Sequence, residues 1–153
     1  MTNLNEVTAY LCSKYPYKSE LSKARLTKLV YLADWFSAQE HGKQLTDIKW
    51  YFHNFGPYVD DVYELASRHE DIFKINKTTN PYGKEKIVIG LSDGFDDKSI
   101  NIDLDDKLIL DKVINETQGM YWDRFIKYVY STKPIAKSDR YDVLDLVSFA
   151  RKV

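Results

Sequence analysis

The chain has 153 residues and a formal net charge of -1, and its balance of 44% hydrophobic and 29% charged residues excludes a disordered chain. A charge near zero argues against a general electrostatic attraction to nucleic acid, and the single cysteine, Cys12, excludes an internal disulfide. No apolar run approaches the roughly 20 residues that cross a bilayer, so we expect no membrane partner and a single cytoplasmic domain over residues 1–153.

Two helices are predicted before the first glycine of the chain. The first covers residues 5–14. The second begins at Ser19 or Ser22, continues to about Glu40 and ends at Gly42, a residue type that favours helix C-termini. Its apolar residues span too wide an arc for a single neighbour, so we expect a central helix that is buried from two sides.

Aromatic residues concentrate around one Gly-Pro pair in the stretch WYFHNFGPYVDDVYELA (50–66). We expect an extended strand over residues 47–55, because aromatic residues are enriched in strands. Gly56 permits the backbone angles of a sharp turn, and Pro57 lacks an N–H group, which suits the first turn of a helix. The stretch is therefore predicted to form a strand, a turn and then a helix.

The aromatic residues of this corner are predicted to lie on two faces, because successive side chains of a strand point in opposite directions. One face is expected to pack in the core. The other either packs as well or contacts a partner, and the sequence leaves both interpretations open. The first face holds Trp50, Phe52 and Phe55, and the second holds Tyr51, His53 and Tyr58.

A β-hairpin and an acidic segment are predicted in the middle of the chain. Residues 71–77 and 85–91 are the strands, separated by the turn-forming sequence TTNPYG. Residues 92–106 contain six Asp and one Lys. Their spacing departs from that of an EF-hand, so we interpret the segment as a surface loop that ends at a helix N-terminus.

The C-terminal third is predicted to be helical, with a second amphipathic helix over 122–130 and a short last helix over 139–151. Residues 121–153 hold seven basic and four acidic side chains, an excess too small to predict a DNA-binding surface. The fold class is therefore α+β, a predominantly helical single domain with a small antiparallel β-sheet or hairpin. Four residues are expected to share the buried face of the helix before residue 122: Leu104, Leu108, Val113 and Ile114.

Motifs of catalysis, metal binding and cofactor binding are missing from the sequence. The three histidines lack metal-ligand spacing, and Cys12 lies in an amphipathic helix, where a buried and inert thiol is expected. We therefore expect no enzyme, no metal and no cofactor. The enzymatic alternative would require a closed pocket that gathers His53 with Asp34 or Asp61.

The sequence LTKLVYLADWFSAQEHGKQLTDIKWYFHNFGPYVDDVYELA (26–66) resembles the Panacea (SocA-like) antitoxin domain. The resemblance lies in the order of a KLVYLAD helix, an aromatic strand, Gly-Pro and a helix with VYEL. The later YWDRFIKYVYSTKPIAKSDRYDVLDL fits the same family. Members often have Gly-Pro-Val, whereas this chain has Tyr58 after Pro57. The motif positions that carry over are Lys28, Tyr31, Asp34, Trp35, Gly56, Pro57 and Tyr63.

The resemblance implies an antitoxin, a small protein that neutralises a cognate toxin by binding it. One branch of the family delivers its toxin to a protease, so a proteolytic adaptor with a protease or chaperone partner is the first alternative. A nucleic-acid-binding regulator is the second, and a homo-oligomer is compatible with either. We nominate Tyr31, Trp35, Tyr51, His53, Tyr58 and Asp61 as partner-binding residues, and Gly56, Pro57 and Tyr63 as residues that define the corner.

Overall fold

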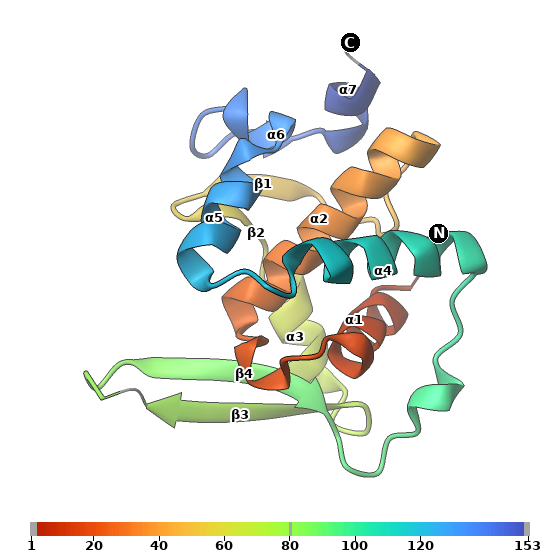
Figure 1. Cartoon of the computed structure of the whole chain (residues 1–153), viewed down its shortest axis with the longest axis vertical. Coiled ribbons are helices and arrows are strands. Elements are labelled where there is room, and N and C mark those ends of the chain that lie inside the picture. Colours follow the sequence, from red (N-terminus) through yellow and green to blue (C-terminus); the bar gives the residue numbers. More distant parts are fainter. Residues whose placement is uncertain (1–2, 80, 152–153) are drawn as a thin grey trace.

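A long helix, α2, passes through the middle of the molecule, and the other elements surround it (Figure 1). The computed structural model describes residues 3–79 and 81–151. The elements are α1 (Leu4–Lys14), η1 (Lys18–Glu20), α2 (Lys23–His41), β1 (Trp50–His53), β2 (Gly56–Tyr58), α3 (Asp61–Arg68), β3 (Phe73–Thr79), β4 (Glu85–Leu91), η2 (Asp97–Ser99), α4 (Leu104–Thr117), α5 (Trp122–Ser131), α6 (Lys133–Ala136), β5 (Val143–Leu144) and α7 (Leu146–Arg151). The predicted α+β class is confirmed.

The central position of α2 is confirmed, since every residue from Arg25 to Ala38 is buried. Ser22 caps its first turn by accepting a hydrogen bond from the Arg25 N–H at 3.1 Å. Gly42 ends the helix in the left-handed conformation, with φ of 71°. Helices α1, α3, α4 and α7 and strand β2 all pack on α2.

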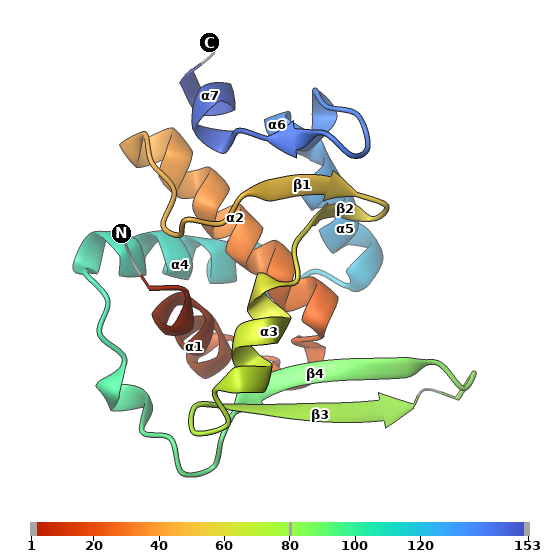
Figure 2. The same ribbon diagram turned by 180° about the vertical axis from the view of Figure 1, so that it is seen from behind.

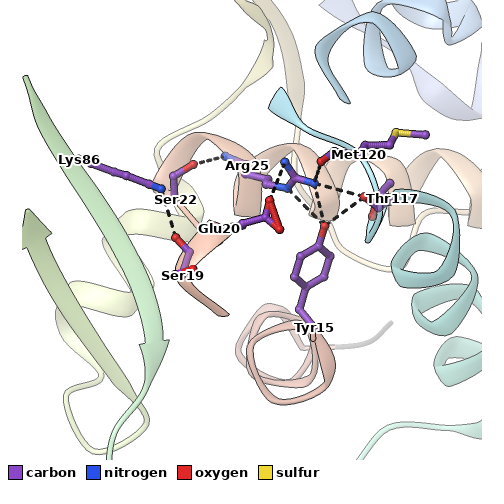
Figure 3. A network of polar contacts seen from close by, with 8 residues as sticks. All are labelled: Tyr15, Ser19, Glu20, Ser22, Arg25, Lys86, Thr117 and Met120. Carbon is purple, nitrogen blue, oxygen red and sulfur yellow. Dashed lines mark hydrogen bonds and ion pairs between the residues drawn. The ribbon is translucent and has the colours of Figure 1, made fainter. Parts of the chain in front are cut away.

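A buried cation joins α2 to α1 and α4 (Figure 3). Arg25 Nη2 donates to Tyr15 Oη (3.0 Å), to the Thr117 carbonyl (3.2 Å) and to the Met120 carbonyl (2.7 Å). Its guanidinium also lies 4.5 Å from the centre of the Phe125 ring. The charge is therefore satisfied by several partners, as a buried charge must be.

The small sheet has the order β2-β1-β5 and is antiparallel. The prediction that Pro57 lies in the first turn of a helix is wrong, because Gly56 and Pro57 both lie in β2, and α3 begins only at Asp61. Pro57 pairs with Phe52 at the edge of the sheet, where a residue without an N–H group is tolerated. Two residues, Asn54 and Phe55, connect β1 to β2 and close a hairpin that the sequence analysis did not predict.

The predicted helix over 139–151 is also wrong in its first half. Val143 and Leu144 form β5, and α7 covers only Leu146–Arg151. This segment gains backbone hydrogen bonds to β1 instead, with Phe52 N–H donating to the Asp142 carbonyl at 3.0 Å. Pairing with a neighbouring strand has overridden the local helical preference.

The hairpin of β3 and β4 is confirmed and extends from one end of the molecule, with α3 between it and the β1–β2 strands (Figure 2). The acidic segment is a loop that ends at α4, as predicted.

The prediction that four residues of α4 share one buried face is wrong. Leu104 and Leu108 are 70% and 58% exposed, whereas Val113 and Ile114 are buried. At about 100° per residue, the first two lie opposite the last two.

Helix α5 agrees with the predicted amphipathic helix over 122–130, and it buries Phe125 and Val129. Trp122, at its first residue, is 44% exposed. Within the described residues, none of the helices combines the length and apolar character needed to cross a bilayer.

Candidate protein-binding surface

The inner face of the β2-β1-β5 sheet is fixed to α2 by a buried carboxylate. Asp34 accepts hydrogen bonds from the Thr46 N–H (2.9 Å), the Thr46 hydroxyl (2.6 Å) and Trp50 Nε1 (2.9 Å). Gln44 Nε2 donates a further bond at 3.3 Å. Burial raises the pKa of Asp34 to about 6, and the hydrogen bonds oppose this effect. Donors from β1 and from the loop before it therefore hold the strand in place.

Two of the residues predicted to contact a partner lie in this inner layer. Tyr31 is fully buried, shares a hydrogen bond of 2.8 Å with the Thr132 hydroxyl and packs edge-on against Trp50, with ring centres 5.5 Å apart. Trp35 is 5% exposed. Both rings are therefore packed in the core, apart from the exposed residues on the other side of the sheet.

The other four predicted residues, Tyr51, His53, Tyr58 and Asp61, line one open groove of about 900 Å³ on the outer side of the sheet. Tyr51 is 46% exposed and pairs with Tyr58 in the neighbouring strand. The centre of the His53 ring lies 6.1 Å from that of Tyr58. The fold therefore brings together residues from β1, β2 and the start of α3.

The predicted alternation along β1 is confirmed, because Trp50 and Phe52 are buried while Tyr51 and His53 are exposed. The expected inward position of Phe55 is wrong, and this residue is 78% exposed. Phe55 lies in the turn between β1 and β2, where strand alternation no longer applies.

Two residues that were not predicted from the sequence extend this surface: Val143 in β5, and Tyr141 in the turn just before that strand. Val143 pairs with Tyr51, and the Tyr141 ring lies 6.5 Å from that of His53. The Tyr141 hydroxyl donates to Asn54 Oδ1 at 2.7 Å. A strand of two residues is too short to show periodicity, so no local signal would have found them. We call Tyr51, His53, Tyr58 and Tyr141 the outer aromatic face.

The backbone of Tyr141 is in an uncommon conformation, with φ of 75°. Positive φ costs free energy in residues with a bulky side chain, and such residues are concentrated at functional sites. The Tyr141 N–H donates to the Phe52 carbonyl at 2.5 Å, which holds this conformation against β1. The outer aromatic face therefore includes a strained position.

The corner residues carried over from the motif have distinct structural roles. Gly56 has φ of 99°, and a Cβ atom at this position would lie 3.2 Å from the Tyr130 ring. The Lys23 ammonium lies 4.5 Å from the centre of the Tyr63 ring. Lys28 is buried beside this corner, and burial lowers the pKa of its ammonium to about 8.

Of the two carboxylates named for the enzymatic alternative, one shares a groove with His53 and the other does not. Asp34 is buried on the inner side of β1, whereas His53 is exposed on the outer side. Asp61 lines the same groove as His53, but no hydrogen bond joins them among the described residues. Cys12 is buried as predicted, and burial raises the pKa of its thiol to about 12. Over residues 3–79 and 81–151, no group of His, Cys, Asp and Glu has a metal-binding arrangement.

A family model described as "Antitoxin SocA-like, Panacea domain" matches residues 26–134. The match includes most of α2, the strands β1 and β2, the β3–β4 hairpin and the four groove residues predicted from the sequence. It ends before Tyr141 and Val143. Comparisons with curated proteins and with solved structures gave no match. Because the matched range covers more than half of the chain, the protein belongs to the SocA-like Panacea antitoxin family.

Proposed function

We propose that this protein neutralises a cognate toxin by binding it directly through the outer aromatic face. Membership of an antitoxin family supports a toxin as the partner and favours a role that is not enzymatic. The toxin is recognised without cofactor or metal. Its active surface is covered while the complex persists.

The observation that carries this proposal is the exposure of aromatic side chains on a well-anchored strand. Tyr51 and His53 point outward from a β-strand whose inward residue, Trp50, is fully buried and hydrogen-bonded to Asp34. Exposed tyrosines with few rotatable bonds are frequent anchors of protein interfaces. An anchored strand also presents these rings with little loss of conformational entropy on binding.

The proposal is tested by expressing the product of each adjacent open reading frame in a bacterial host, with and without this protein. We expect one neighbouring product to arrest growth, and co-expression to restore growth and give a stable complex. Failure of every neighbouring product to be neutralised or bound would overturn the proposal.

Two variants then locate the surface. The double variant Tyr51→Ala/Tyr141→Ala is expected to raise the Kd of the complex by about thirtyfold, the effect of losing a strong interface anchor. Tyr17→Ala removes an exposed ring outside the groove and is the matched control. Equal binding by both variants would place the interface elsewhere.

The lifetime of the toxin separates occlusion from delivery to a protease. Occlusion leaves the toxin lifetime unchanged or longer when this protein is present. A shorter lifetime that requires a host protease would establish the adaptor alternative and contradict occlusion.

A further inference from the structure

We propose that the groove receives a cationic side chain, an arginine or a lysine, from the partner protein. This inference rests on the proposed function, because it specifies the chemistry of the partner at the same surface. It follows from the charges that line the groove, from the aromatic rings among them and from a contact that the chain already makes there.

Carboxylates outnumber ammonium groups around the groove. Four carboxylates and two ammonium groups line the groove. Among the described residues, neither Asp47 nor Asp61 makes a hydrogen bond or an ion pair. Glu64 is only loosely engaged, 3.9 Å from the exposed Arg68. A cationic group entering the groove would therefore meet uncompensated negative charge. The charged lining residues are Lys23, Asp47, Lys49, Asp60, Asp61 and Glu64.

The position of α3 raises the opposite possibility, since the N-terminus of a helix attracts anions. The helix dipole contributes about half an elementary positive charge there. The chain already places Asp60 at the cap of α3 and Asp61 and Glu64 in its first turn. These three carboxylates exceed the dipole charge several times over, so the groove favours a cation over an anion.

A lysine of the chain itself shows that the aromatic rings here accept an ammonium group. Lys23 Nζ lies 4.5 Å from the centre of the Tyr63 ring and 5.8 Å from that of Tyr58. Both distances are within the range of a cation–π interaction. Among the described residues, Tyr51 and His53 have no such cation over their rings, although they line the same groove. A partner cation could therefore contact the Tyr51 ring, whereas the His53 ring already contacts the rings of Tyr58 and Tyr141.

The guanidinium group combines the features that suit this groove. It is planar, stacks on aromatic rings and is more weakly hydrated than an ammonium group. It also donates several hydrogen bonds to carboxylates, which Asp47 and Asp61 can accept. We therefore expect arginine to bind more tightly than lysine, and both to bind far more tightly than a neutral side chain.

The test is an NMR titration of the ¹⁵N-labelled full chain with the peptide acetyl-Gly-Arg-Gly-amide. The matched peptide carries citrulline, which has the shape of arginine without its charge. We expect the arginine peptide to shift the amide signals of Tyr51, His53, Tyr58 and Asp61, and the citrulline peptide to bind at least about tenfold more weakly. Equal binding of the two peptides, or shifts confined to other residues, would overturn the inference.

Charge variants show which carboxylates act. The double variant Asp47→Asn/Asp61→Asn is expected to weaken binding of the arginine peptide about tenfold. The control, Asp71→Asn/Asp93→Asn, changes the net charge equally at two exposed positions outside the groove and should bind the peptide normally. If both double variants lost affinity for the arginine peptide equally, the effect would come from the net charge of the protein, and a specific site would be contradicted.

The same variants separate this inference from the proposed function. If no toxin is bound but the arginine peptide occupies the groove, the proposed function fails alone. If the toxin complex is lost with Tyr51→Ala/Tyr141→Ala but unaffected by Asp47→Asn/Asp61→Asn, the function stands and the cationic contact is wrong.

A second copy of this chain is the alternative occupant of the groove, through the exposed lysines of its β-hairpin. In that case the amide signals of the groove residues would shift with protein concentration alone, and sedimentation would show a dimer. These two results together would identify the second copy as the occupant and overturn the inference of a partner cation.

Discussion

The inner and outer faces of the β2-β1-β5 sheet are built from adjacent residues, but they differ in whether their polar groups are buried and hydrogen-bonded. On the inner face, Trp50 is buried and its indole N–H is bonded to Asp34. On the outer face, Tyr51 is half-exposed, and no hydrogen bond to its hydroxyl occurs among the described residues. The inner face therefore determines stability, while the outer face is available for binding.

This difference has a useful consequence, because successive residues of one strand should give separable effects when they are replaced. Changes on the inner face should mainly alter the free energy of unfolding, and changes on the outer face should mainly alter binding. Lys28, a buried ammonium near this sheet, is the exception within the inner layer. Among the described residues it makes no hydrogen bond, and its ammonium group lies 5.8 Å from the centre of the Tyr58 ring.

The largest effect is expected for Asp34→Ala on the inner face. The change leaves the Trp50 indole N–H and both Thr46 donors without their acceptor in a buried site. Each such donor costs about 1–3 kcal/mol, so we expect a loss of about 3–5 kcal/mol in the free energy of unfolding. Urea denaturation measures it, and Asp61→Ala on the outer side is the control, expected within about 0.5 kcal/mol of the parent. Equal losses would contradict the division between the faces.

A gain in stability is expected for Lys28→Met, which keeps the apolar stem and removes the charge. Since burial lowers the pKa of Lys28 to about 8 from its usual 10.5, the folded chain disfavours the charged form. We expect a gain of about 2–3 kcal/mol at pH 7.

The pH dependence of this gain follows from the direction of the pKa shift. Between about pH 8 and 10.5 the unfolded chain holds more protons at this lysine, so the parent gains stability as pH rises. The advantage of the variant should therefore shrink over this range and be constant below it. Urea denaturation of both proteins from pH 7 to pH 9.5 measures the difference, and an advantage independent of pH would assign the gain to packing.

Most of the fold is predictable from the sequence, because long amphipathic segments carry a strong periodic signal. The helices α1 and α2 and the β3–β4 hairpin agree closely with their predicted ranges. The errors occur where pairing between distant segments decides the structure. Pro57 is compatible both with a first helical turn and with an edge strand, and only the hairpin with β1 selects the second.

The candidate site was predictable only in part, for a related reason. The outward positions of Tyr51 and His53 follow from alternation along one strand, whereas Tyr141 lies in the turn before β5, a strand that the local sequence does not reveal. Tyr31 and Trp35 are buried, which the sequence did not predict, because the wide apolar arc of α2 does not show which of its rings remain exposed. Burial on every side of α2 depends on the packing of four other helices and of the small sheet.

A moderate effect is expected at the turn that joins the two faces, for Gly56→Ala. The residue has φ of 99°, a conformation that side chains disfavour, and its new Cβ atom would lie 3.2 Å from the Tyr130 ring. We expect a loss of about 1–2 kcal/mol in the free energy of unfolding. Gly94→Ala, where an added Cβ meets no atom within 4 Å, is the control. A loss equal in both variants would mean that the turn at Gly56 is not constrained by its geometry.

The smallest effect on stability is expected for Tyr141→Gly on the outer face, although the change removes a large side chain. Glycine accepts the φ of 75° without strain, and this relief of about 1 kcal/mol offsets the lost hydrogen bond to Asn54. Urea denaturation should therefore place the variant within about 0.5 kcal/mol of the parent. Tyr141→Ala loses the same contacts but keeps the strain, so it should be less stable than Tyr141→Gly by about 1 kcal/mol. Equal stability of the two variants would show that the backbone at this position stores no strain, and that the ring is held at the surface by its side-chain contacts alone.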